Sequence, residues 1–172
     1  MKKIRVVFLE DNRSDMRALT QLLQNTEQFD VVIYDSKIIF EDQIKNSDCD
    51  LIILDIDLSK SKGLKSDRFV PGTVVAEEIR TNLPELDHVP ILITSAWWDE
   101  LPQNSFDYEA ENSFRGFFSI GKQEWGENGA KLIGKIANIM FRWPSFLCCK
   151  SEHSRAAMAD RYEGFEFPIW RR

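Results

Sequence analysis

LIILDIDL, residues 51–58, is an apolar run that carries two aspartates at its end, Asp55 and Asp57. A short apolar run without strict alternation of apolar and polar side chains is typical of a strand covered on both faces in a parallel sheet. Carboxylates at the end of such a strand need a partner of opposite charge. The stretch therefore predicts a buried strand that leads into a site of ion chemistry.

Runs of the same kind recur along the chain and predict five strands, at residues 4–9, 29–34, 50–55, 89–95 and 115–121. Between them, apolar residues recur at helical spacing. The predicted helices lie near 16–23, 37–46, 72–83, from about 105, and 128–142. Ser14 is the expected cap of the first, and Pro84 and Pro144 are expected to end the third and the last. Alternating strands and helices indicate a doubly wound α/β sheet, which binds ligands beyond the carboxyl ends of its strands.

The composition of the 172 residues limits which kinds of binding partner and which cellular compartment are expected for this protein. The net charge is −6 and no basic block occurs, which argues against nucleic acid or an anionic membrane as the main partner. No apolar run is long enough to span a membrane, and acidic residues come too early for a signal peptide, so a cytoplasmic protein is expected. Cys49, Cys148 and Cys149 are expected to be reduced thiols, and a metal site at Cys148, Cys149 and His153 lacks a second ligand pair.

The chain is expected to form one domain over residues 1–143, followed by an extension over residues 144–172. The extension is too short for a separate DNA-binding or catalytic domain. It is rich in aromatic side chains, which are costly to leave in water: Tyr162, Phe165, Phe167 and Trp170. We therefore expect it to dock as an extended peptide on its own domain or on a partner subunit.

Polar residues mark four of the predicted strand ends: Glu10 and Asp11, Asp55, Thr94 and Ser95, and Lys122. Three carboxylates gathered at one edge of a sheet would repel one another by about 4 kcal/mol per pair at ~4 Å and an effective dielectric constant near 20. A divalent cation neutralises them, and oxygen ligands suit Mg²⁺. An aspartate beside such an ion can attack phosphorus, while a hydroxyl and an ammonium hold the phosphoryl oxygens.

With these residues the sequence resembles the receiver domain of two-component response regulators over about residues 3–143. The acidic pair in VVFLEDN, Asp55 in DLIILDIDL, Ser95 in PILITSA and Lys122 in FFSIGK stand in the family's order, and Asp55 follows Asp11 by 44 residues. The resemblance implies a flavodoxin-like parallel sheet with the strand order 2-1-3-4-5. It also implies that Asp55 accepts the phosphoryl group and that Ser95 and Lys122 bind it.

The same resemblance implies a Mg²⁺ site and a signalling role. Glu10, Asp11, Asp55 and the main-chain carbonyl of Asp57 would hold the ion. The phosphoryl group would come from a histidine kinase or a phosphotransfer protein. The output would be made through contacts with a downstream protein or a second copy in a homodimer, with no direct contact to nucleic acid or membrane. The chain would not be an enzyme beyond its own phosphorylation from a donor.

Three departures from the family pattern are visible. Gln123 stands where the family has a proline after the lysine, and Ser119 stands where it has an aromatic switch residue. Residues 58–72 form a long polar and basic stretch where the family has a short turn. These departures leave open a second interpretation, in which the chain is a receiver-like module that binds a partner without phosphorylation.

A third interpretation is a phosphatase of the haloacid-dehalogenase type. In that family the first of two aspartates spaced like Asp55 and Asp57 attacks phosphorus, and the second acts as acid and base. Ser95 and Lys122 fit its next two motifs. These enzymes also need an acidic pair after the lysine at another strand end, whereas here the metal-binding acids precede the aspartate.

Overall fold

A five-stranded parallel sheet in the order β2-β1-β3-β4-β5 forms the centre of the computed structural model, which describes residues 3–58, 72–96, 116–125 and 129–147. The strands are β1 (Ile4–Leu9), β2 (Phe29–Tyr34), β3 (Leu51–Asp55), β4 (Ile91–Ser95) and β5 (Phe117–Gly121). The helices are α1 (Arg13–Gln24), α2 (Lys37–Ile44), α3 (Gly72–Asn82) and α5 (Ala130–Leu147), with short 3₁₀ turns η1 (Pro84–Leu86) and η4 (Lys122–Trp125). This order confirms the predicted doubly wound fold.

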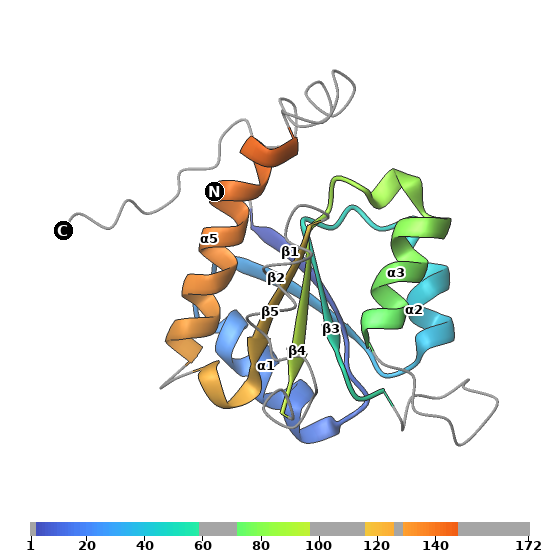
Figure 1. Cartoon of the computed structure of the whole chain (residues 1–172). Coiled ribbons are helices and arrows are strands. Elements are labelled where there is room, and N and C mark those ends of the chain that lie inside the picture. The colour runs from blue at the N-terminus through green and yellow to red at the C-terminus, as the bar shows by residue number, and fades with distance from the viewer. Residues whose placement is uncertain (1–2, 59–71, 97–115, 126–128, 148–172) are drawn as a thin grey trace.

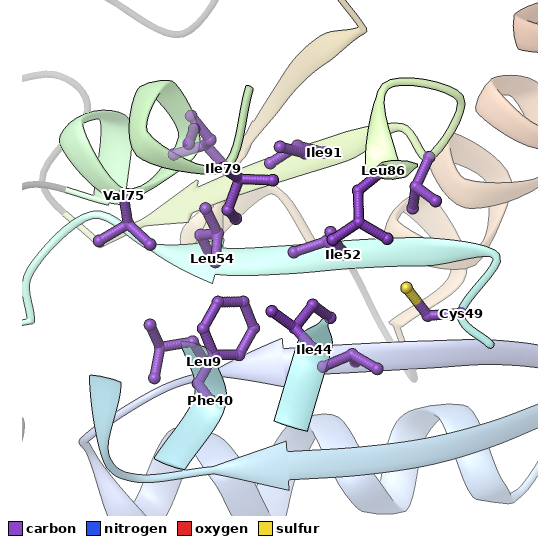
Figure 2. Close-up of a cluster of buried hydrophobic side chains, with 14 of the residues drawn as sticks. Leu9, Phe40, Ile44, Cys49, Ile52, Leu54, Val75, Ile79, Leu86 and Ile91 are labelled. Carbon is purple, nitrogen blue, oxygen red and sulfur yellow. The ribbon is translucent and has the colours of Figure 1, made fainter. Parts of the chain in front are cut away.

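Helices cover both faces of the sheet, with α2 and α3 on one side and α1 and α5 on the other (Figure 1). One buried cluster joins α2 and α3 to the sheet, and Figure 2 shows its side chains from β1, β3 and β4 meeting Phe40, Ile44, Val75 and Ile79. A second cluster on the opposite face includes Leu19 and Leu23 of α1 and Leu132, Ile136 and Ile139 of α5. Burial on both faces explains why β3, β4 and β5 are apolar without alternation.

Three predicted strands begin one or two residues too early, each for a local reason. Asp50 lies outside β3 because its carboxylate accepts a hydrogen bond from the main-chain N–H of Arg5 at 2.8 Å. Pro90 lies before β4 and has no N–H to donate to a sheet. Gly116 precedes β5 with φ of 81°, a left-handed conformation that only glycine adopts at little cost.

The first helix begins earlier than predicted, and its N-cap is Asn12 rather than Ser14. The Asn12 side chain accepts hydrogen bonds from the main-chain N–H of Ser14 at 3.1 Å and from the Ser14 hydroxyl at 2.8 Å. Asn12 also has the extended backbone of an N-cap residue, with φ −90° and ψ 111°. The prediction was wrong by two residues because the helical spacing of the apolar side chains does not distinguish two neighbouring polar caps.

The last helix continues through Pro144 to Leu147, so the prediction that Pro144 ends it was wrong. A proline inside a helix costs about 3 kcal/mol because it lacks an N–H and crowds the preceding turn. The adjacent Trp143 is anchored in the core, which offsets this cost. The predicted boundary between domain and extension thus falls within a helix. Residues 148–172 lie outside the described residues, as does the helix expected from about 105, and docking of the extension stays a prediction.

Trp143 fixes the end of α5 against the sheet. Its indole Nε1–H donates a hydrogen bond to the main-chain carbonyl of His88 at 2.7 Å. Its ring stands perpendicular to that of Phe118, with the ring centroids 6.0 Å apart. A Cβ on Gly116 would lie 2.6 Å from the same ring. Contacts to β5, to Gly116 just before it, and to His88 before β4 hold this part of α5 in place.

Trp143→Ala is expected to lower the free energy of unfolding by about 3–5 kcal/mol, because it leaves a cavity and an unpaired carbonyl. Denaturation in urea, followed by circular dichroism, measures the loss. Phe141→Ala is the control, because Phe141 lies in the same helix but is 68% exposed, and a change of about 0.5 kcal/mol or less is expected there. Equal effects of the two substitutions would contradict the observed packing.

Among the described residues, none of the helices is both long enough and apolar enough to cross a membrane.

Candidate functional site

The register of the sheet places the predicted site residues at one edge, where the carboxyl ends of β1, β3, β4 and β5 meet. Leu9 pairs with Leu54, so Glu10 follows β1 beside Asp55, the last residue of β3. Asp55 in turn pairs with Thr94. Ser95, the last residue of β4, pairs with Gly121, and Lys122 comes directly after it. Parallel pairing thus gathers residues that are far apart in the sequence.

Three carboxylates converge at this edge: Glu10, Asp11 and Asp55. One oxygen of each lies within 4.8 Å of the others. Glu10 and Asp55 are buried, and Asp11 is half-buried. The Glu10 Oε1 atom accepts a hydrogen bond from the main-chain N–H of Asn12 at 2.9 Å, which fixes the orientation of its carboxyl group. The structure therefore brings together the three acidic side chains that the sequence predicted as metal ligands.

Lys122 supplies the positive charge in the centre of this cluster. Its Nζ lies 2.7 Å from Glu10 Oε2 and 2.6 Å from Asp15 Oδ2, with the geometry of hydrogen bonds. It lies 3.1 Å from Asp55 Oδ1. The lysine side chain is only 11% exposed, so solvent screens these ion pairs weakly. The predicted pairing of Lys122 with the Asp55 carboxylate is present.

Burial and mutual charge shift the acid–base properties of the cluster. Burial, and after it the charge of Asp55, raise the pKa of Glu10 to about 8 against the opposing effect of Lys122. Burial likewise raises the pKa of Asp55, although Lys122 opposes this rise. Burial alone would lower the pKa of Lys122, but the charges of Asp55 and Glu10 outweigh it, so the net pKa is raised. Lys122 therefore remains an ammonium, and a further cation bound at this edge would favour the charged form of the two carboxyl groups whose pKa values are raised.

The donor set fits a magnesium ion. Asp55 Oδ1 is buried and pairs with the Lys122 ammonium at 3.1 Å, and the remaining lone pairs of this carboxylate can accept a ligand. Glu10, Asp11 and Asp55 offer oxygen atoms only, and Mg²⁺ prefers oxygen ligands from one or two carboxylates together with water and phosphate. Asp57 lies two residues beyond β3 and is half-buried, and the role of its main-chain carbonyl as a further ligand stays a prediction.

Ser95 is buried at the end of β4, one residue beyond the partner of Asp55. Its neighbour Thr94 was not predicted to have a role, yet its hydroxyl is buried and has no hydrogen-bond partner among the described residues. Thr94 is directly paired with Asp55, so this hydroxyl belongs to the residue of β4 that lies beside Asp55. The β-branched shape of Thr94 suits a strand, but its hydroxyl does not suit an apolar position.

Thr94→Val should raise the free energy of unfolding by about 1 kcal/mol, because valine has the same shape and removes an unpaired buried hydroxyl. The measurement is urea denaturation in the presence of a chelator, so that no metal contributes. Ser95→Ala serves as the comparison at the next residue. A loss of stability in Thr94→Val would mean that the hydroxyl has a partner in solution.

Asp15 is the residue of this site that the sequence reasoning missed. It lies in the first turn of α1, four residues after Asp11, and its carboxylate contacts Lys122. Acids are favoured in a first turn, so the position of Asp15 alone suggested only a favourable interaction with the helix dipole. Its partner Lys122 is far away in the sequence, and no local pattern links the two.

Solved structures of receiver domains resemble this chain, although no family model and no curated protein matches its sequence. A receiver domain from Methanospirillum hungatei JF-1 matches with a TM-score of 0.60 and 17% identity, over 84% of this chain and 98% of that one. The response regulator domain of Thermotoga maritima CheB matches with a TM-score of 0.60 and 16% identity, over 81% and 97%.

A receiver domain from Clostridium thermocellum matches with a TM-score of 0.57 and 17% identity, over 81% of this chain and 95% of that one. Sequence identities this low support a shared fold but not a shared activity. The strand order β2-β1-β3-β4-β5 and the helices on both faces agree with these neighbours. The chain therefore has the fold of the CheY-like receiver domains of response regulators.

Proposed function

We propose that this chain is a phosphoacceptor signalling protein of a two-component system, phosphorylated on Asp55 with the help of Mg²⁺. The observation that carries the proposal is the group of Glu10, Asp11 and Asp55, in which Lys122 pairs with Glu10 and Asp55. It lies at the carboxyl edge of a receiver-type sheet, the edge where doubly wound sheets bind their ligands. The burial of Asp55 beside the Lys122 ammonium adds to this support.

The proposed reaction is transfer of a phosphoryl group from a donor to a carboxylate. An Asp55 oxygen forms a bond to phosphorus, and the bond between phosphorus and the donor breaks, with its electron pair leaving on the donor. The Lys122 ammonium lies close enough to Asp55 to bind the incoming phosphoryl oxygens, and the Ser95 hydroxyl is the second expected donor. Bound Mg²⁺ would supply further positive charge to these oxygens.

The phosphodonor in this proposal is a histidine kinase or a phosphotransfer protein, and the output is a contact with a downstream protein or a second copy of the chain. A phosphoryl group on Asp55 would draw Ser95 and Lys122 toward it and shift a two-state equilibrium near β4 and β5. Ser119 is buried on β5 in the place of the family's aromatic switch residue. The proposed switch therefore does not depend on a large side chain at that position.

Incubation of the purified chain with Mg²⁺ and acetyl phosphate tests the proposal. Intact mass spectrometry should detect the gain of one phosphoryl group, and the adduct should disappear when EDTA replaces Mg²⁺. Beryllofluoride, a mimic of the phosphoryl group, should give a saturable change in tryptophan fluorescence, because Trp125 follows Lys122 by three residues.

Absence of both responses would overturn the proposed function and favour a module that binds its partner without phosphorylation. Continuous release of phosphate from ordinary phosphate esters would instead favour the phosphatase interpretation. A chain phosphorylated once per molecule, without turnover of such esters, is the expected result.

A further inference from the structure

Lys122 is held on the α1 side of the site. Its two hydrogen bonds run to Glu10 Oε2 and Asp15 Oδ2, at 2.7 and 2.6 Å. Its contact with Asp55 Oδ1 is longer, at 3.1 Å. The ammonium group has three N–H donors, of which these two bonds use two. The lysine therefore interacts most closely with residues other than the expected phosphoacceptor.

Asp15 is held in a fixed position next to Lys122, because it belongs to a helix. It occupies the first turn of α1, which begins after the Asn12 cap. Its side chain is 29% exposed, compared with 11% for the lysine, so the ion pair lies at the rim of the site rather than in open solvent. Charge-assisted hydrogen bonds are short and strong, and here the 2.6 Å distance is the shortest that Lys122 makes among the described residues.

We propose that Asp15 is a positioning residue that restrains Lys122 and thereby opposes the phosphorylated state. The inference rests on the proposed function, in which the ammonium binds phosphoryl oxygens on Asp55. The Asp15 carboxylate holds one of the three N–H donors, which those oxygens then cannot use, and the negative charge of Asp15 also repels them. Asp15 thus controls how strongly Lys122 binds the phosphoryl group. By this route it also controls the population of the switched state.

Titration with beryllofluoride at saturating Mg²⁺, read by tryptophan fluorescence, tests the restraint. Asp15→Asn keeps the size of the side chain but replaces a charge-assisted hydrogen bond by a neutral one, which is about half as strong. The expected result is an approximately fivefold lower Kd for beryllofluoride. Asp15→Asn should not lower the Kd for Mg²⁺ alone, because the substitution removes negative charge near a cation site.

Glu124→Gln is the matched control. Glu124 lies in η4, two residues after Lys122, and is exposed. The substitution Glu124→Gln removes the same charge from the same end of the molecule. Its Kd for beryllofluoride should stay within about twofold of the unsubstituted value, because exposed charges are well screened. A restraint on the lysine predicts that Asp15→Asn binds beryllofluoride more tightly but does not bind Mg²⁺ more tightly. A general loosening of the site would instead weaken the binding of both ligands.

Two results would overturn the inference: an unchanged or weaker affinity of Asp15→Asn for beryllofluoride, or an equal tightening in Glu124→Gln. Both results presuppose that the natural chain responds to beryllofluoride. If the natural chain itself gives no Mg²⁺-dependent response, the proposed function fails, and the inference about Asp15 fails with it. If the unsubstituted chain responds and the Asp15→Asn variant has the same Kd for beryllofluoride, the inference about Asp15 fails while the proposed function stands.

Discussion

Asp55→Asn is expected to abolish the phosphoryl adduct completely, with no gain in mass after incubation with Mg²⁺ and acetyl phosphate. The amide nitrogen and oxygen of asparagine do not form a stable bond to phosphorus as a carboxylate does. The substitution also removes one of the three carboxylates that lie within 4.8 Å of one another, so the affinity for Mg²⁺ should fall. Intact mass and fluorescence titration measure the two effects separately.

Asp57→Asn is the control for this substitution, because it removes a carboxylate two residues away on the same connection. Asp57 is half-buried and does not belong to the carboxylate group at the centre of the site. Its expected contribution is a main-chain carbonyl, which asparagine retains. The adduct should therefore form in Asp57→Asn. An adduct that persists in Asp55→Asn, or is lost only in Asp57→Asn, would place the acceptor elsewhere.

Gly72→Ala should destabilise the protein by about 3 kcal/mol and weaken Mg²⁺ binding as well. Gly72 begins α3, and its N–H donates a hydrogen bond to the main-chain carbonyl of Ile56 at 3.0 Å. A Cβ at this position would clash with the main-chain oxygen of Asp55. Since main-chain atoms of a buried strand cannot move aside, either α3 or the end of β3 must shift. Urea denaturation and Mg²⁺ titration measure the two consequences.

Gly134→Ala provides the matched control. Gly134 lies inside α5, and a Cβ added there would meet no atom within 4 Å among the described residues outside the adjacent turns of its own helix. Alanine in a helix interior is more stable than glycine by about 0.5–1 kcal/mol, so this variant should gain stability. If Gly72→Ala behaved like Gly134→Ala, the close approach of α3 to the end of β3 would be wrong.

Much of the fold followed from the local sequence. The cores of all five strands and the helices α1, α2, α3 and α5 lie where the apolar pattern predicted them. The errors concern ends, where local hydrogen bonds decide. Asn12 rather than Ser14 caps α1, and Asp50 binds the main chain of Arg5 instead of continuing β3. Such choices depend on the geometry of one or two side chains, which periodicity does not describe.

The candidate site was also largely predictable, because the residues that end parallel strands meet at one edge whatever the details of packing. Glu10, Asp11 and Asp55 do converge, and Lys122 lies beside them. Asp15 was missed because its partner is 107 residues away in the sequence. A residue of this kind is recognised only when the distance between α1 and the end of β5 is known.

The sequence by itself determined the five strands, their burial on both faces and the acids at their ends, because these depend on short apolar runs and on the residues that follow them. Only the tertiary structure decided the partners of Lys122 and the continuation of α5 through Pro144. Lys122 contacts Asp15 because two distant segments are packed together. The helix continues because Trp143 is held by the carbonyl of His88. Both outcomes are set by contacts between segments far apart in the chain, and no local pattern carries that information.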